Sequence, residues 1–153
     1  MRVSVSAQDT AAKRSVLIVE DHPLVRRGFR ELLCDEPDLK VCGESGASEE
    51  ALRLFRSAAP DLVLVDISLP DGSGLGLVEN LVALDADAKV LVVSVHDDPL
   101  YAERALSAGA LGYVNKQEDE AILLQAVRSV LNGNAYVSPA VYRRWPERSL
   151  LGG

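Results

Sequence analysis

Residues 61–66 read DLVLVD, four apolar residues between two aspartates. A short, continuous apolar run rich in valine is typical of a strand that is covered on both faces. The runs VLIV at 16–19 and VLVV at 90–93 have the same character. Strands of this kind occur in parallel sheets with helices on each side, so the three runs indicate an α/β protein.

Strand-like runs and helical patterns alternate along the chain outward from this stretch. The five runs are 15–20 (SVLIVE), 39–44 (LKVCGE), 61–66 (DLVLVD), 89–95 (KVLVVSV) and 111–115 (LGYVN). Each run is followed by a segment with apolar residues at helical spacing. Five successive strand–helix units predict a doubly wound parallel sheet with right-handed crossovers.

Local signals predict where the helices begin and end. Pro23 suits the first position of the first helix, because its missing N–H is not needed there. Ser48 is predicted to cap the second helix with its hydroxyl. The turn at 70–74 (PDGSG) precedes the third helix, and Gly109 and Gly133 are predicted helix stops.

Length and composition indicate one ordinary globular domain. The chain has 153 residues, of which 48% are hydrophobic and 25% are charged. A net charge of −7 argues against a surface built to bind nucleic acid. No apolar run is long enough to span a membrane, and residues 1–14 lack the apolar core of a signal peptide, which makes the cytoplasm the expected compartment.

Both ends of the chain lack a clear pattern. Residues 1–14 are predicted to be a flexible tail, and residues 134–153 a C-terminal tail or the start of a linker. Four residues that could carry chemistry are assigned structural roles, because none belongs to a recognisable cluster of partners. They are Cys34, Cys42, His22 and Trp145, and the two cysteines are expected to be small buried residues.

Charged and polar side chains stand where the predicted strands end. Glu20 and Asp21 follow the first strand, Asp66 ends the third, Ser94 ends the fourth, and Lys116 follows the fifth. The carboxyl ends of parallel strands meet at one edge of the sheet, which is where ligands bind in folds of this class. Three carboxylates, a hydroxyl and an ammonium group are therefore expected to converge.

Such a cluster of carboxylates needs a compensating cation. Mg²⁺ is a hard ion that prefers oxygen ligands and commonly accompanies phosphate, and Glu20 and Asp21 are predicted to hold it. Asp66 would give one oxygen to the metal and use the other as a nucleophile toward a phosphoryl group. Lys116 and the Ser94 hydroxyl would then neutralise the transferred oxygens.

Four segments of the chain together resemble receiver domains of response regulators of the NarL/FixJ (LuxR-type) family. The resemblance covers about residues 15–133, and its elements stand in the family's order. The segments are 16–29 (VLIVEDHPLVRRGF), 61–75 (DLVLVDISLPDGSGL), 91–98 (LVVSVHDD) and 105–116 (ALSAGALGYVNK).

The resemblance implies a fold, a function and a role for each site residue. It implies a flavodoxin-like (βα)5 sheet of strand order 2-1-3-4-5, in which a sensor histidine kinase phosphorylates an aspartate with the help of Mg²⁺. The implied roles are Asp66 as phosphoacceptor, Glu20, Asp21 and the Ile67 carbonyl as further metal ligands, Lys116 as phosphate contact, Ser94 and Tyr113 as conformational switch, and Ser68 and His96 as residues that flank the phosphate.

A receiver of this kind is a phosphoacceptor switch, not an enzyme, although self-phosphorylation from small donors and autodephosphorylation are expected of it. The sequence differs from the family pattern in two conservative ways: Glu20 stands where aspartate is common, and Ser94 where threonine is frequent. Family members usually continue into a helix-turn-helix domain that binds DNA, which is not found in these 153 residues. Binding to DNA is therefore expected only through such an output domain, and homodimerisation is left open.

Other functions fit the sequence less well. A flavodoxin-like electron carrier needs a phosphate cradle after the first strand, where Glu20 and Asp21 would repel a flavin phosphate. An aspartate-dependent phosphatase would place a second aspartate at position 68, which is serine, and no P-loop motif is present. The remaining alternative is a receiver-like interaction module that works without phosphorylation.

Overall fold

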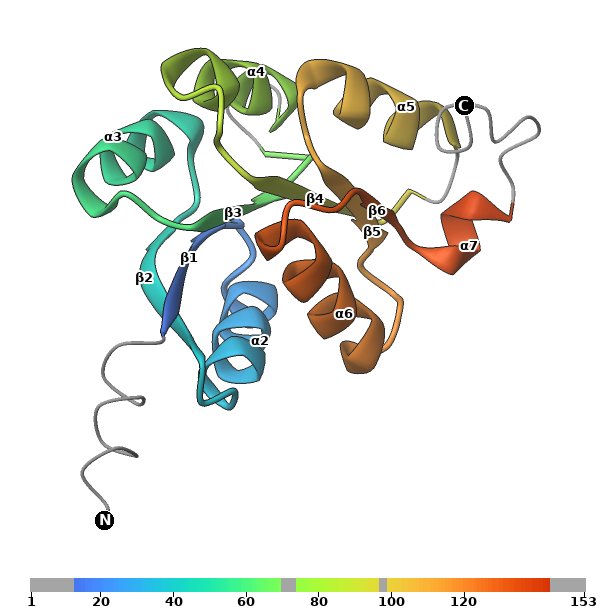
Figure 1. Cartoon of the computed structure of the whole chain (residues 1–153), viewed down its shortest axis with the longest axis horizontal. Helices are drawn as coiled ribbons and strands as arrows, with labels where there is room; N and C mark the ends of the chain where they lie inside the picture. Colours follow the sequence, from blue (N-terminus) through green and yellow to red (C-terminus); the bar gives the residue numbers. More distant parts are fainter. Residues whose placement is uncertain (1–12, 70–73, 97–98, 144–153) are drawn as a thin grey trace.

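The computed structural model describes residues 13–69, 74–96 and 99–143. Its sheet has the order β2-β1-β3-β4-β5-β6, and all neighbouring strands are parallel (Figure 1). The strands are β1 (Arg14–Val19), β2 (Leu39–Ser45), β3 (Leu62–Asp66), β4 (Val90–Ser94), β5 (Gly112–Asn115) and β6 (Tyr136–Val137). The predicted doubly wound α/β fold and the order of its first five strands are confirmed.

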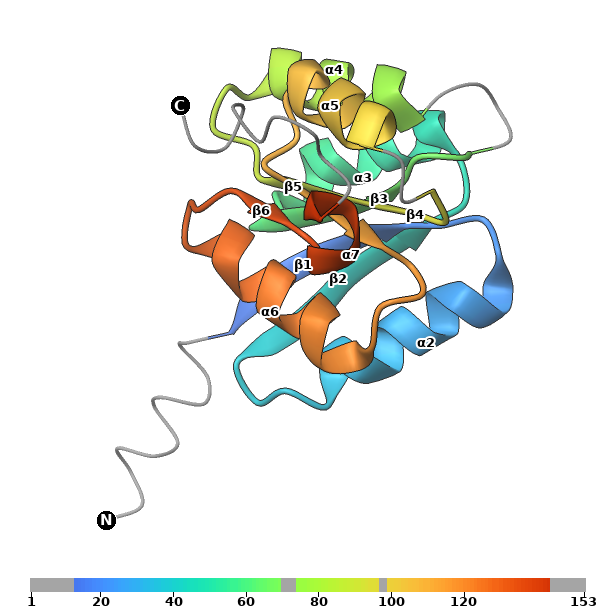
Figure 2. The same cartoon turned by 90° about the vertical axis from the view of Figure 1, so that its right-hand side faces the viewer.

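Helices cover both faces of the sheet. One face carries α2 (Pro23–Cys34) and α6 (Glu120–Leu131), and the other carries α3 (Ser48–Ala58), α4 (Gly74–Leu84) and α5 (Pro99–Ala108) (Figure 2). The short helix α7 (Pro139–Tyr142) follows β6. None of the described helices combines the length and the apolar character that crossing a bilayer would require.

The alternation of side chains along β1 explains its unbroken apolar sequence. Leu17 and Val19 pack into the core layer shared with α3, α4 and α5. Val16 and Ile18 pack into the opposite layer, with α2 and α6. Because successive residues of a strand face opposite sides, a strand between two helical layers needs apolar residues at every position.

The sixth strand was not predicted. β6 continues the sheet beside β5, with the Tyr136 N–H donating to the Leu111 carbonyl (3.1 Å) and the Ser138 N–H donating to the Tyr113 carbonyl (3.0 Å). Val141 of α7 is fully buried in the core. A strand of two residues has no periodicity that a sequence pattern could reveal, because its pairing is decided by the exposed edge of β5.

Most of the helix ends predicted from the sequence agree with the structure. Pro23 occupies the first turn of α2 as predicted. The predicted cap at Ser48 is wrong, because Ala47 is the N-cap and Ser48 is already helical. The hydroxyl of Ser45 accepts a hydrogen bond from the Ala47 N–H (3.1 Å). The predicted helix stops have a left-handed backbone that glycine tolerates: Gly109 (φ 118°) and Gly133 (φ 85°).

Close packing at the start of α4 supplies a first prediction. A Cβ atom on Gly74 would lie 2.5 Å from the Asp66 carbonyl oxygen and 2.7 Å from the Ile67 Cα, and these backbone atoms cannot move aside. We expect Gly74→Ala to lower the free energy of unfolding by about 1–3 kcal/mol. Urea unfolding of the purified variant measures the change.

Gly28, in the interior of α2, is the matched control. A Cβ atom there would have no neighbour within 4 Å outside its own helix. Gly28→Ala should therefore raise the free energy of unfolding by up to about 1 kcal/mol, because alanine favours the helix more than glycine does. Equal effects of the two substitutions would contradict the close approach at Gly74.

Candidate functional site

Four of the predicted site residues lie at the carboxyl ends of adjacent strands. Glu20 follows β1, Asp66 is the last residue of β3, Ser94 is the last residue of β4, and Lys116 follows β5. The side chains of Glu20 and Ser94 are fully buried, and Asp66 is 1% exposed. The parallel order of the strands, with β1, β3, β4 and β5 as neighbours, brings these distant parts of the sequence to one edge.

Lys116 connects the two buried carboxylates. Its Nζ lies 2.9 Å from Glu20 Oε1 and 3.2 Å from Asp66 Oδ2. Both oxygens are within ion-pair distance of the ammonium group, yet neither has a hydrogen-bond partner of good geometry among the described residues. Buried carboxylate oxygens without such partners are costly, so the site can accommodate a further positive group.

The acidic cluster, which we define as Glu20, Asp21 and Asp66, has the composition of a cation site. Ligand atoms of these three residues and of His22 lie within 4.8 Å of one another. Asp21 Oδ1 is a third buried oxygen without a hydrogen bond among the described residues. Three carboxylates facing one ammonium group leave excess negative charge, and the oxygen ligands suit a hard divalent ion such as Mg²⁺.

His22 is the residue at this site that sequence reasoning missed. Its Nδ1 lies 2.9 Å from Glu20 Oε2 and 3.2 Å from Asp21 Oδ1. The hydrogen bond to Glu20 and the negative charges of both carboxylates raise the pKa of the His22 imidazole. A single histidine before a proline has no pattern that reveals this contact, and its side chain is 63% exposed.

The second oxygen of Asp66 and the Ile67 carbonyl are held by backbone amides. Asp66 Oδ1 accepts a hydrogen bond from the Ser68 N–H (3.0 Å), and the Ile67 carbonyl accepts one from the Gly74 N–H (3.2 Å). The Ile67 oxygen keeps a second lone pair. Its predicted role as a metal ligand, and that of the Ser68 side chain beside a phosphate, stay predictions.

His96 connects the two predicted switch residues. Its N–H donates to Ser94 Oγ (3.0 Å), and its carbonyl accepts the Tyr113 hydroxyl (2.7 Å). The Tyr113 side chain is completely buried. The His96 ring stacks on Tyr101 of α5, with ring centroids 4.2 Å apart and an angle of 13° between the planes. Residue 96 therefore joins the end of β4, the ring of Tyr113 and helix α5.

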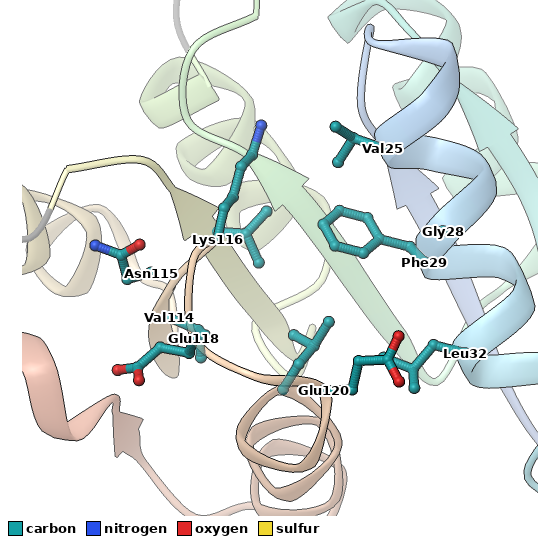
Figure 3. Close-up of a pocket in the computed structure, with 11 residues that line it drawn as sticks. Val25, Gly28, Phe29, Leu32, Val114, Asn115, Lys116, Glu118 and Glu120 are labelled. Carbon is teal, nitrogen blue, oxygen red and sulfur yellow. The ribbon is translucent and has the colours of Figure 1, made fainter.

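A pocket of about 220 Å³ adjoins the site, between α2 and the β5–α6 connection. Figure 3 shows Val25 and Phe29 projecting from α2 toward the chain segment that carries Lys116. Lys116 is the only residue of the site in the pocket lining, which does not include the acidic cluster. The pocket is thus a neighbour of the carboxylates and not the place where they meet.

The two cysteines take no part in this site. Both are free thiols, Cys42 is half-buried, and Cys34 is exposed at the end of α2. The prediction of small buried residues is therefore wrong for Cys34. Burial raises the pKa of the Cys42 thiol, which disfavours its reactive thiolate form.

Comparison with known proteins identifies the family. The response regulator receiver domain profile matches residues 16–128. This chain belongs to the response regulator receiver family. Receivers of this family are phosphoacceptor switches of two-component systems and not conventional enzymes.

Curated relatives and a solved structure agree with this assignment. The chain is 37% identical over 129 residues to the transcriptional regulatory protein DegU of Brevibacillus brevis, covering 84% of this chain and 55% of DegU. It is 38% identical over 126 residues to the response regulator GacA of Pseudomonas aeruginosa, covering 82% of this chain and 59% of GacA. The chain thus spans a little over half the length of these relatives.

The structure of a LuxR-family two-component response regulator from Aurantimonas sp. has a similar fold. The two structures share a TM-score of 0.85 and 34% sequence identity, over 90% of this receiver and 99% of the other chain. The predicted resemblance to the NarL/FixJ (LuxR-type) receivers is thereby confirmed.

Proposed function

We propose that this receiver accepts a phosphoryl group on Asp66 from the phosphohistidine of a sensor histidine kinase. The observation that carries the proposal is the position of the Asp66 carboxylate. It is 99% buried, lies 3.2 Å from Lys116 Nζ, and shares a cluster of ligand atoms with Glu20 and Asp21. A carboxylate beside an ammonium group and a cation site is arranged for phosphoryl transfer.

In this reaction an Asp66 oxygen attacks phosphorus in line with the bond to the histidine nitrogen of the kinase. A phosphorus–oxygen bond forms and the phosphorus–nitrogen bond breaks, leaving its electron pair on the imidazole and an acyl phosphate on Asp66. Lys116, already beside this carboxylate, stabilises the negative charge of the transferred oxygens. Mg²⁺, held by the acidic cluster and the Ile67 carbonyl, would supply further charge neutralisation.

The switch follows from the contacts of Ser94. We expect its hydroxyl to donate to the phosphoryl group, which changes the bond that Ser94 Oγ now accepts from the His96 N–H. Because His96 also holds the Tyr113 hydroxyl and stacks on Tyr101, the change reaches β5 and α5 together. Phosphorylation, which is a local change of charge, would then alter the packing of the face formed by β5 and α5.

The output of the switch belongs to the same proposal. The relatives are response regulators and a transcriptional regulatory protein, and we infer that this receiver controls transcription or a partner protein in the cytoplasm. Contact with DNA would use an output domain outside residues 1–153, and a homodimer is one form such control could take. The receiver was predicted to occupy about residues 15–133, and β6 and α7 extend its sheet and core to Tyr142.

Mass spectrometry after treatment with acetyl phosphate tests the proposal. The protein is expected to gain the mass of one phosphoryl group when Mg²⁺ is present and to gain little when a chelator removes the ion. Fragmentation should place the group on the peptide that contains Asp66. A protein that binds its partner but is never phosphorylated would instead support the phosphorylation-independent interaction module.

Ser94→Ala tests whether the Ser94 hydroxyl transmits the effect of phosphorylation to α5. The variant should still gain a phosphoryl group, but most of the phosphorylation-dependent chemical-shift change in α5 should be lost, because the hydroxyl that connects the phosphate to His96 is gone. Nuclear magnetic resonance spectra of α5 amides measure this. Ser57→Ala, which removes an exposed hydroxyl on α3, is the control, and an unaltered α5 response in Ser94→Ala would exclude Ser94 from the switch.

A further inference from the structure

The imidazole of His22 lies beside the acidic cluster, on the side that is open to solvent. The two oxygens of Glu20 face different neighbours: Oε1 lies 2.9 Å from Lys116 Nζ, and Oε2 lies 2.9 Å from His22 Nδ1. His22 Nδ1 is also 3.2 Å from Asp21 Oδ1. The ammonium group and the imidazole therefore contact different oxygens of one buried carboxylate.

The backbone around His22 favours this position of the ring. His22 is the N-cap of α2, in an extended conformation (φ −83°, ψ 115°), and Pro23 restricts the residue before it to that region. The His22 N–H also donates to Glu20 Oε2 (3.2 Å). Backbone and side chain of His22 thus converge on the same oxygen, while 63% of the side chain stays open to solvent.

The spacing of these atoms suits a shared metal ion. Ligand atoms that bind one ion at about 2.1 Å in neighbouring octahedral positions lie about 3 Å apart. The two distances from His22 Nδ1, 2.9 Å and 3.2 Å, have this size, and the first is a hydrogen bond that Nδ1 would give up, with its proton, on binding the ion. A second observation also points to a cation: Glu20 and Asp66 are at least 99% buried, and Glu20 Oε1 and Asp66 Oδ2, although ion-paired to Lys116, have no hydrogen bond among the described residues.

The ligand atoms at the site determine which metal ions bind more tightly. Mg²⁺ prefers oxygen ligands and gains little from an imidazole. First-row transition ions such as Co²⁺ and Ni²⁺ accept imidazole readily, whereas Mn²⁺ is closer to Mg²⁺ in its preference for oxygen ligands, and affinity rises from Mn²⁺ through Co²⁺ to Ni²⁺. A site with three carboxylates and one imidazole therefore discriminates between the two classes of ion more than an all-oxygen site does.

We propose that His22 is a direct ligand of a transition-metal ion at this site, so that the receiver binds Co²⁺ with a larger preference over Mg²⁺ than the acidic cluster alone would give. The inference rests on the proposed role of the cluster as a cation site. It requires no phosphorylation, so it can be tested on binding alone.

Calorimetric titration of Co²⁺ and of Mg²⁺ into the whole chain and into His22→Ala provides the first test. We expect the substitution to weaken Co²⁺ binding by about tenfold or more, in line with the loss of one ligand, and to change Mg²⁺ binding by less than about twofold. His22→Asn, which keeps a good N-cap residue, should behave like His22→Ala. Glu20→Gln should weaken the binding of both ions.

Pulsed electron paramagnetic resonance of the Mn²⁺-loaded protein provides the second test. Wild type should show a coupling between the ion and a ¹⁴N nucleus, and His22→Ala should not, although His96, the other histidine of the chain, remains. A Co²⁺-to-Mg²⁺ affinity ratio that is equal in wild type and His22→Ala, or a nitrogen coupling that persists in the variant, would overturn the inference. Wild type that binds neither ion would overturn the cation role in the proposed function as well.

Discussion

Replacing Asp66 by asparagine is expected to abolish phosphorylation from acetyl phosphate and from a kinase. The amide has nearly the same shape as the carboxylate, so the change removes the nucleophile and leaves the volume intact. Its carbonyl oxygen has no full negative charge with which to attack phosphorus. Intact-protein mass spectrometry should therefore show no phosphoryl adduct on Asp66→Asn under conditions that modify wild type fully.

The fold of Asp66→Asn should survive. The substitution removes one of two buried carboxylates that Lys116 contacts, so Glu20 keeps its cation and loses a like-charged neighbour. We expect a free energy of unfolding at least equal to that of wild type in metal-free buffer, and weaker binding of Mg²⁺.

Asp87→Asn is the matched control for this substitution. Asp87 is exposed in the connection between α4 and β4, at the opposite edge of the sheet from the acidic cluster. The same chemical change there should leave phosphorylation unaltered. Wild-type phosphorylation of a correctly folded Asp66→Asn protein would refute Asp66 as the phosphoacceptor.

Lys116→Met is expected to have the largest effect on stability. Methionine retains most of the length of the side chain but leaves Glu20 and Asp66, both at least 99% buried, without their cation. Loss of one partner of a buried ion pair typically costs about 3–5 kcal/mol. Urea unfolding in metal-free buffer should show a loss of this size.

Mg²⁺ should restore part of that loss. A divalent ion that binds only the folded state stabilises it by an amount that grows with the logarithm of the ion concentration divided by its dissociation constant. The ion should bind more tightly to the variant, because Lys116 no longer repels it. The increase in stability on adding Mg²⁺ should therefore be larger for Lys116→Met than for wild type, while phosphorylation should be slowed in the variant.

Lys40→Met controls for the loss of an ordinary lysine. Lys40 is an exposed residue of β2, and its replacement should change the free energy of unfolding by less than about 0.5 kcal/mol. If Lys116→Met were as stable as Lys40→Met in the absence of metal, the ammonium group would not be compensating the buried carboxylates.

Sequence reasoning succeeded where a pattern has a single structural meaning. Continuous apolar runs can be buried on both sides only between helical layers, so the ends of β1, β3 and β4 are predicted to within one residue. Because parallel strands end at a common edge, the same pattern predicts that Glu20, Asp66 and Lys116 lie together. The structure places these three side chains in direct contact.

Sequence reasoning failed where contacts between distant parts of the chain decide the local structure. β6 exists because the edge of β5 offers unpaired backbone groups, and nothing within residues 136–137 indicates this. His22 contacts the carboxylates because Pro23 and the β1–α2 turn direct it there. The stacking of His96 on Tyr101 likewise depends on how α5 packs beside the end of β4. Such contacts are properties of three-dimensional packing and not of residue spacing.

Hydrogen bonds of Tyr113 connect the phosphorylation site to the residues that follow β6, the last strand of the sheet. Its hydroxyl is bound to the His96 carbonyl, and its own carbonyl accepts the Ser138 N–H, while the Ser138 hydroxyl accepts the Asn115 N–H. Tyr113 is thus anchored at both its side chain and its main chain. Hydrogen exchange at the Ser138 amide, which lies between β6 and α7, should therefore record events at Asp66 without any label in the site itself.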